Sequence, residues 1–457
     1  MRNWIIGLIV TSVVLLAGLV WGLYNMRIDW LQAIMLIFTY YGMLLILVAA
    51  VTRPKKFLIN KDYSPFISIV IPARNEAYVI ANTVRSILKL DYKKDDKLNF
   101  EILVMDDNSS DDTFEIAQEL EIEFPGVVRA VHRGPEIAGK GKSMVLNDGM
   151  KRAKGDIIAV FDADTNVAPN FFKNAIPLLY DPQVGGLQGR VRLYNRHKNL
   201  LTALQEDEFA VVSHLYQLGK ELVGGLTALG GNGQLVKRKA LDDVDGWNWL
   251  SPTEDLDLTF RLLFKGWHVR YAPDAVLKQE GVEGIHAFIR QRVRWAEGFL
   301  KCIFDYTIPL IFSRASIMKK LDGTMTMIRV LIPFFVWIGY IFIGVALVKG
   351  VEFSSGVSPT LMIISSWAFF GALTVAMFRT IYPNVFTALF RVIRYSFYNL
   401  FWVIAVPIGF VNCIRHINDI YWDKTTHTGG SPKRTKPSRP PEEFTDSPAL
   451  TVAEAAD

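Results

Sequence analysis

Four short motifs in the middle of this chain carry side chains whose types and order could do chemistry. Paired carboxylates suit a metal ion and a nucleotide, and a carboxylate at the start of a helix suits a general base. A Gln, an Arg and a Trp on one helix face suit an acceptor molecule. In chain order the motifs are Asp106-Asp107, Asp162-Ala163-Asp164, Thr253-Glu254-Asp255 and Gln291-Arg292-Val293-Arg294-Trp295.

Asp162 and Asp164 directly follow the apolar run Ile157–Phe161. With a spacing of two, both side chains project to one side of an extended chain. A hard divalent cation binds such oxygens together with phosphate oxygens and water, and it would neutralise charge on a departing diphosphate. A solvated acidic turn is the alternative for an isolated pair, but the other three motifs favour a metal site.

Asp106 and Asp107 also end an apolar strand, and Asp107 is the better candidate to hydrogen-bond a uracil base. The segment that ends the first strand is expected to form the other wall of that pocket through Pro72, Ala73 and Glu76. Further along, Asp111 and Asp112 precede a helical pattern, and we expect them to act as capping and helix-dipole residues.

A glycine-rich segment, Gly139-Lys140-Gly141-Lys142, resembles a phosphate-binding loop. Together with Gly134 it matches most of the Walker A pattern, but Gly141 stands where that pattern requires Ser or Thr. The substitution argues against a P-loop NTPase. Lys142 opens the next helical pattern and is the better candidate to contact the pyrophosphate of a donor.

The segment from Ser251 to Glu254 has the form of a capping box, with Ser251 as the N-cap and Pro252 at the first helical position. This structural role explains Glu254 but leaves Asp255 unexplained. We expect the helix dipole to keep Asp255 ionised, which is the state a general base needs to take a proton from an acceptor hydroxyl.

Gln291, Arg294 and Trp295 stand at positions i, i+3 and i+4, so they share one face of a helix. An interfacial helix with a snorkelling Arg and a membrane-belt Trp is the structural alternative. On the functional interpretation, Trp295 stacks on a sugar ring and Arg294 contacts the diphosphate.

Alternating apolar runs and amphipathic stretches predict an α/β domain that positions these motifs. Each expected strand leads into a loop with Asp, Asn or Gly, where open sheets place ligands. The expected strands are Phe66–Ile71, Glu101–Met105, Val127–Val131 and Ile157–Phe161, and the expected helices are Glu76–Leu90, Thr113–Glu123, Ser143–Ala153 and Asn199–Leu218.

Apolar segments long enough to cross ~30 Å of hydrocarbon flank this domain on both sides. Arg53, Lys55 and Lys56 follow the second segment, which places the middle of the chain in the cytoplasm by the positive-inside rule. We therefore expect a multi-pass protein of the cell membrane with a cytoplasmic catalytic domain. The uncharged segments are Trp4–Tyr24, Trp30–Thr52, Val330–Val348, Phe353–Phe378 and Tyr395–Ile414.

The expected domains are a transmembrane hairpin at 1–60, the catalytic domain at 61–282, interfacial amphipathic helices at 283–326, transmembrane helices at 327–420 and a disordered tail at 421–457. Three C-terminal spans would put the tail outside, yet its Lys and Arg residues favour the cytoplasm. Either Tyr395–Ile414 is interfacial, or Thr380–Phe390 belongs to an extra kinked span.

Composition argues against nucleic-acid binding, a disulfide framework and a zinc site. The 457 residues carry a formal net charge of +5, without the basic helix or aromatic-interleaved basic strip that is typical of nucleic-acid binding. The two cysteines, Cys302 and Cys413, lack metal-ligand spacing, so they predict neither a disulfide framework nor a zinc site.

The motif order from Phe66 to Tyr306, with the flanking apolar segments, resembles the membrane-embedded family 2 glycosyltransferases, which include cellulose, chitin and hyaluronan synthases. The resemblance implies a GT-A fold, a UDP-sugar donor, a divalent Mg or Mn cation and inversion at the anomeric carbon by direct displacement. It implies that Asp107 binds uracil, that Asp162 and Asp164 bind UDP and the metal, and that Asp255 is the general base. It further implies that Gln291 and Trp295 hold the acceptor and that Arg294 binds the diphosphate.

Two features leave the acceptor open. Cellulose synthases carry a Phe-x-Val-Thr-x-Lys gating loop that this sequence lacks, and 422–427 is a candidate either for a related role or for a juxtamembrane tail. In addition, the segments 230–234, 280–282 and 291–298 are similar to those of bacterial glucosyltransferases that glucosylate diacylglycerol.

We expect transfer of a hexose or N-acetylhexosamine from UDP-glucose or UDP-N-acetylglucosamine to a growing β-linked polysaccharide. Transfer of β-glucose to a lipid such as diacylglycerol is the first alternative, and a non-catalytic membrane sensor or scaffold that binds nucleotide sugars is the second. The expected partners are the UDP-sugar, a glycan or lipid acceptor, the lipid bilayer and accessory export or regulatory proteins, with no nucleic acid.

Overall fold

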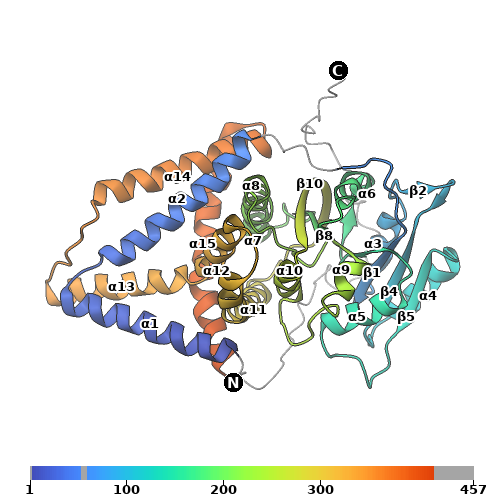
Figure 1. Ribbon diagram of the computed structural model, residues 1–457, viewed down its shortest axis with the longest axis horizontal. Helices are drawn as coiled ribbons and strands as arrows, with labels where there is room; N and C mark the ends of the chain where they lie inside the picture. Colours follow the sequence, from blue (N-terminus) through green and yellow to red (C-terminus); the bar gives the residue numbers. More distant parts are fainter. Residues whose placement is uncertain (1–2, 53–58, 416–457) are drawn as a thin grey trace.

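The computed structural model describes residues 3–52 and 59–415 and has two halves (Figure 1). An α/β domain occupies one half, and long apolar helices extend away from it to form the other. The tail 421–457, with the segment 422–427, lies outside the described residues, as do Arg53, Lys55 and Lys56.

A mixed eight-stranded sheet forms the centre of the α/β domain, in the order β5-β4-β1-β6-β9-β8-β10-β7. The neighbours β5, β4, β1 and β6 run parallel, whereas β9 runs antiparallel to both β6 and β8. Carboxyl ends of parallel neighbours meet at one edge of a sheet. The strands are β1 Ile67–Ala73, β4 Phe100–Asp106, β5 Val128–His132, β6 Ile157–Val160, β7 Asn166–Val167, β8 Val184–Leu193, β9 Gln234–Lys237 and β10 His268–Gln279, and a separate hairpin joins β2 Lys93–Lys94 to β3 Lys97–Leu98.

Helices cover both faces of this sheet, which explains why its central strands are apolar on both sides. One face packs against α3 Ile80–Ile87, α4 Thr113–Glu123 and α6 Phe171–Ala175, which is followed by the short η1 Ile176–Leu179. The other face packs against α5 Lys142–Arg152, α9 Arg238–Asp242 and α10 Glu254–Phe264. All four predicted strands are confirmed, and α4 begins and ends where it was predicted.

Two predicted helices differ from the structure. The first, Glu76–Leu90, is shortened at both ends to α3; its first residues form a turn, in which the Val79 and Ile80 amides donate to the Glu76 carbonyl. The second, Asn199–Leu218, is split into α7 Leu200–Glu208, a π-helical stretch η2 Phe209–Tyr216, and α8 Gln217–Val223. Apolar spacing cannot distinguish a π-helix from an α-helix over so short a run.

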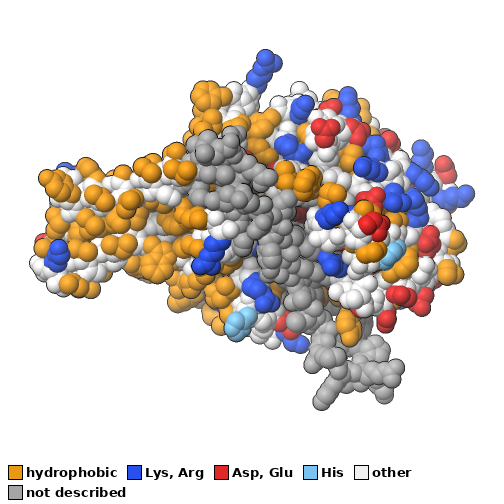
Figure 2. Space-filling view, turned by 90° about the horizontal axis from the view of Figure 1, so that it is seen from below, with side chains coloured by type: hydrophobic (Ala, Val, Ile, Leu, Met, Phe, Trp, Pro, Cys, Tyr) orange, Lys and Arg blue, Asp and Glu red, His pale blue; other side chains and the backbone are white. Residues whose placement is uncertain are grey.

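The apolar half is a bundle of α1 Asn3–Asn25, α2 Asp29–Val51, α13 Ile332–Lys349 and α14 Pro359–Thr380. Its outer side chains are apolar and exposed, with Leu347 80%, Val348 87% and Trp367 70% accessible. Figure 2 shows this orange surface at one end and the charged surface of the α/β domain at the other. An exposed apolar surface of this length needs a lipid environment.

By length and composition, four of the described helices could cross a membrane, namely α2, α13, α14 and α15 Val385–Arg415, while α1 has a described apolar stretch at Ile9–Asn25. Figure 1 shows α15 running across the inner end of the bundle rather than along it. Arg391 and Arg394 on α15 pair with Asp207 of α7 at 2.9 and 2.7 Å, which ties the first half of α15 to the α/β domain. Residues 385–390 start this same helix, and the interfacial alternative for Tyr395–Ile414 stays a prediction.

Two further helices, α11 Ile285–Phe312 and α12 Ile317–Arg329, lie between the α/β domain and the bundle. They occupy the segment predicted as interfacial. On α11, Arg292 is 1% exposed and packs inside the protein, and Arg294, the Arg of the snorkelling alternative, is half-buried.

Candidate active site

The carboxyl ends of β1, β4 and β6 open into a cavity of about 1050 Å³ that also reaches α11 and the bundle. Every site residue predicted from the sequence lines this cavity, although the individual roles stay predictions. These residues are Pro72, Ala73, Glu76, Asp107, Lys142, Asp162, Asp164, Asp255, Gln291, Arg294 and Trp295.

Asp107 anchors the glycine-rich loop to the end of the sheet. Its carboxylate pairs with the guanidinium of Arg133 and accepts a hydrogen bond from the Gly139 amide at 3.0 Å. Its own amide donates to the Ala73 carbonyl at 2.8 Å. Sequence reasoning missed Arg133, because a single Arg after a strand carries no local sign of a partner on the neighbouring strand.

Lys142 opens α5 and holds two of the motifs together. Its ammonium lies 2.5 Å from Asp162 Oδ1 and 3.6 Å from Glu254 Oε1. Burial works to lower the pKa of Lys142, but the Asp162 and Glu254 carboxylates outweigh it and raise that pKa above its ordinary value. Lys142 is therefore a permanent positive charge in the middle of the acidic motifs.

Asp162 and Asp164 are held by residues far away in the sequence. The Asn232 side chain accepts hydrogen bonds from the Asp162 amide at 3.2 Å and from the Thr165 hydroxyl at 3.0 Å. Asp164 accepts a hydrogen bond from the Glu280 amide at 2.9 Å. The segments around Asn232 and Glu280, which the sequence singled out without a role, thus position the two carboxylates.

The residues present fit a divalent cation by their chemistry. Asp162 and Asp164 present hard carboxylate oxygens to a cavity with room for phosphate oxygens and water, which together complete such a coordination sphere. Among residues 3–52 and 59–415, no group of three or more His, Cys, Asp or Glu side chains is arranged to hold a metal by itself.

The predicted capping box before Asp255 is wrong. Helix α10 begins at Glu254 with Thr253 as its N-cap, and no side chain caps it. The Ser251 hydroxyl donates instead to the Thr253 carbonyl at 3.1 Å. The Glu254 side chain, freed from the capping role, turns towards Lys142.

Asp255 lies in the first turn of α10 and lines the cavity. Burial and the neighbouring Glu254 carboxylate raise the pKa of Asp255 to about 7, although the Leu256 amide and Lys142 act in the opposite direction. The expectation that the helix dipole keeps Asp255 fully ionised is therefore corrected. A carboxyl group with a pKa near 7 is suited to accept a proton at neutral pH.

Gly231 lies close to both Asp255 and Lys142. Its φ of +78° is left-handed, and a Cβ there would lie 3.2 Å from Asp255 Oδ2 and 3.6 Å from Lys142 Nζ. A larger residue would be strained and would crowd the space beside the candidate base.

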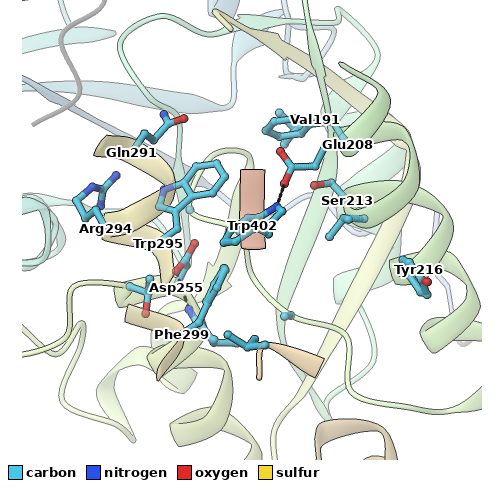
Figure 3. A pocket seen from close by; sticks show the side chains of 18 of the residues that line it. Val191, Glu208, Ser213, Tyr216, Asp255, Gln291, Arg294, Trp295, Phe299 and Trp402 are labelled. Atoms are coloured by element: carbon cyan, nitrogen blue, oxygen red, sulfur yellow. Dashed lines mark hydrogen bonds between the residues drawn. The ribbon is translucent and has the colours of Figure 1, made fainter. Parts of the chain in front are cut away.

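Gln291, Arg294 and Trp295 reach the cavity from α11 (Figure 3). Arg294 Nε is buried and has no hydrogen-bond partner in the part of the chain that the structure describes. The Arg292 guanidinium lies 4.2 Å from the centre of the Trp295 ring, which fixes the orientation of that indole.

The cavity continues beyond Trp295 into the apolar bundle. At this end its walls come from α2, α13, α14 and α15, and most of them are hydrocarbon: Met35, Phe38, Pro333, Val336, Phe369, Phe370, Val403 and Val406. One space therefore joins the carboxylates at the sheet edge to side chains that lie within the bundle.

Known proteins are similar to this chain over the α/β domain, and one of them is similar over a longer stretch. Residues 64–298 match the family described as Glycosyltransferase like family 2. A β-monoglucosyldiacylglycerol synthase of Trichormus variabilis is 32% identical over 381 residues, 82% of this chain and 80% of that protein. A poly-β-1,6-N-acetyl-D-glucosamine synthase of Staphylococcus aureus is 29% identical over 247 residues, 53% of this chain and 57% of that protein.

Among solved structures, a mannosyltransferase from Pyrobaculum calidifontis, in complex with GDP-Man and Mn²⁺, shares the fold with a TM-score of 0.53. It is 19% identical in sequence, and the match covers 81% of this chain and 99% of that one. With the sheet, the motif order and the matched domain in agreement, this chain belongs to glycosyltransferase family 2 and has a GT-A fold flanked by apolar helices.

Proposed function

We propose that this enzyme transfers a hexose from a UDP-sugar, with inversion, to a neutral membrane lipid such as diacylglycerol. One observation carries the proposal: the cavity that Asp255 lines is also lined by apolar side chains of the bundle. A lipid hydroxyl can reach Asp255 along this route while the acyl chains stay among apolar side chains.

The polar end of the cavity supports a nucleotide-diphosphate donor. Lys142 and the unpartnered Arg294 Nε present positive charge to a cavity wall that also carries Asp162 and Asp164. The mannosyltransferase of similar fold was solved with Mn²⁺ and a nucleotide sugar, which agrees with a Mg or Mn ion at these carboxylates. When bound, such an ion would neutralise charge on the leaving diphosphate.

The residues present account for the proton, the new bond and the leaving group of the transfer step. Asp255 takes the proton of the acceptor hydroxyl as its oxygen forms a bond to the anomeric carbon. The bond from that carbon to the β-phosphate oxygen breaks, and its electron pair leaves with UDP. Lys142 and Arg294 stabilise the developing negative charge. Attack from the side opposite the leaving group inverts the anomeric configuration.

Sequence similarity supports a lipid acceptor more broadly than a glycan acceptor. The match to the β-monoglucosyldiacylglycerol synthase is 381 residues long, so it extends from the family domain into the flanking helices. The match to the poly-N-acetylglucosamine synthase is 247 residues long and spans little more than the domain. The longer match supports a lipid acceptor, although another β-monoglucosyldiacylglycerol synthase, of Synechocystis, matches over 258 residues only.

Extension of a β-glycan, which the sequence alone favoured, is the second candidate. Its specific support is the Gln291 and Trp295 face, because an indole can stack on the terminal sugar of a chain. The similarity to the poly-N-acetylglucosamine synthase points the same way. An apolar bundle end is less suited to a polar glycan than to acyl chains.

We further propose that the protein is an integral protein of the cell membrane with its GT-A domain in the cytoplasm, where nucleotide sugars are made. The apolar bundle supports the membrane assignment, and the basic residues that follow α2 support the orientation.

A product assay tests the proposal. Purified enzyme is incubated with labelled UDP-glucose, UDP-N-acetylglucosamine or UDP-galactose, with and without dioleoylglycerol, and the products are separated by thin-layer chromatography. We expect one labelled glycolipid that needs the added lipid and is cleaved by a β-glycosidase. Label that stays at the origin and is degraded by a β-glycanase would contradict a lipid acceptor.

A further inference from the structure

We infer that Trp402 and Phe299 complete an aromatic collar with Trp295 around the acceptor, and that Glu208 positions this collar. The collar would hold the glycerol-ester region of a neutral lipid, between the hydroxyl at Asp255 and the acyl chains in the bundle. This inference rests on the proposed lipid acceptor and assigns it a binding site.

The three rings of the collar come from two helices and face one space. Trp295 and Phe299 lie one turn apart on α11, and Trp402 lies on α15. Phe299 and Trp402 are stacked, with ring centres 6.2 Å apart and planes at 29°. Figure 3 shows the rings gathered beside Asp255, with Ser213 and Tyr216 on the far side of the cavity.

Glu208 ties the two helices of the collar together. Its Oε2 accepts a hydrogen bond from Arg292 Nη2 at 2.7 Å, and its Oε1 accepts one from the indole Trp402 Nε1 at 3.2 Å. Figure 3 shows the second of these bonds as a dashed line. Arg292 in turn stacks on Trp295 and donates from Nε to the Tyr398 hydroxyl at 2.6 Å.

The charges of this network cancel inside the protein. Arg292 and Glu208 are 1% and 6% exposed, so each would be costly to bury without the other. The Arg292–Glu208 pair itself adds no net charge to the collar, and the aromatic faces offer both apolar contact and stacking. Such a ring suits a neutral molecule with an apolar and a polar end better than an anionic one.

Glu208 lies at the cavity wall, where it orients the collar rings as well as packing against Arg292. Glu208 ends α7, where the chain enters the π-helical stretch η2. It lines the cavity together with the three collar rings. Because this buried ion pair fixes the rings before the acceptor binds, less side-chain conformational entropy is lost on binding.

The test compares Trp402→Ala, Trp402→Phe and Glu208→Gln with the parent enzyme and with Phe397→Ala. Phe397 is an aromatic on the same helix, 63% exposed and outside the cavity, so its variant is the matched control. We measure the KM for dioleoylglycerol, kcat, UDP affinity by calorimetry, and hydrolysis of the UDP-sugar without any acceptor.

We expect Trp402→Ala to raise the acceptor KM about tenfold with UDP affinity unchanged. It should also increase acceptor-independent hydrolysis, because the collar no longer keeps water from the donor. Trp402→Phe retains a ring without its N–H, so it and Glu208→Gln should show smaller increases in KM, while Phe397→Ala behaves like the parent.

An unchanged acceptor KM in all three variants, or a loss of UDP affinity that parallels every change in KM, would overturn the collar. If Trp402→Ala does not fold, Trp402→Phe carries the same test. A parent enzyme that makes no glycolipid would refute the proposed acceptor instead, and the hydrolysis measurement then still decides whether the collar excludes water.

Discussion

Asp255 combines two properties that a general base requires, since it lines the cavity and its pKa is raised to about 7. The sequence alone identified it by elimination, after a capping role had been given to Glu254. That role was wrong in its geometry, yet the choice of Asp255 stands as a prediction. Lys142, whose charge acts on the pKa of Asp255, and Gly231, which lies beside it, come from segments that no local pattern connects to it.

Replacing Asp255 by Asn should abolish transfer while leaving UDP affinity within a few-fold, because the base acts on the acceptor. Removal of a general base costs about 10²–10⁴ in rate. Turnover and calorimetric UDP binding check this. Glu254→Gln is the comparison variant. Because Glu254 lies against Lys142, this substitution should weaken UDP binding more than Asp255→Asn does. Near-normal turnover of Asp255→Asn would show that the base lies elsewhere.

The pH dependence of transfer should report Asp255. Only the ionised carboxylate can take a proton, so kcat/KM for the acceptor should fall about tenfold per pH unit below pH 7 and level off above it. Glu254 raises this pKa by its negative charge. The midpoint of the profile should therefore move to lower pH in Glu254→Gln, and a midpoint that stays fixed or rises would contradict the assignment.

Replacing Asp164 by Asn should remove the part of UDP binding that depends on Mn. Calorimetry of parent and variant, each with Mn and with a chelator, measures that part directly. Equal UDP affinity of the parent in both conditions would argue for a metal-independent transferase. Asp181→Asn, at an exposed turn outside the cavity, serves as the control and should bind as the parent does.

At the scale of elements, the strands were predictable and the helix junctions were not. Apolar runs gave β1, β4, β5 and β6, because a doubly covered sheet leaves a strong local signal, and Asp follows two of them, β4 and β6. The start of α10 and the π-helical stretch η2 depend on contacts across the chain, such as Glu254 with Lys142 and Glu208 with Arg292. No window of sequence contains both partners.

The orientation of α15 makes an element-scale prediction about topology. Because α15 runs across the bundle and is paired to Asp207, it should end on the same side of the membrane as the GT-A domain. With Cys302 and Cys413 replaced, Arg415→Cys should react with an impermeant thiol reagent only after cells are permeabilised. The control, Asn25→Cys at the far end of α1, should react in intact cells. The reverse pattern, or labelling of Arg415→Cys in intact cells, would contradict this topology.

For the whole molecule, the arrangement of the two halves explains what neither half shows alone. The edge of the GT-A sheet lines the cavity with acidic and basic side chains, and the apolar bundle lines it with hydrocarbon side chains. The sequence predicted both halves, and every site residue that it predicted lines the cavity, but it gave no role to Glu208, Phe299 or Trp402, which line the cavity as well. It could not predict that the cavity is continuous between them, since this depends on how α11, α12 and α15 pack at the junction.

The central claim is that one hexose is delivered to one lipid through this cavity. The most direct measurement uses purified enzyme in vesicles that contain dioleoylglycerol, with the accepted UDP-sugar. The amount of UDP released is measured, and the mass of the product is determined by mass spectrometry. We predict equal amounts of UDP and of a lipid that has gained a single hexose, with little release when dioleoylglycerol is omitted. Products that carry a long distribution of sugars, formed at the same rate without the lipid, would contradict the account.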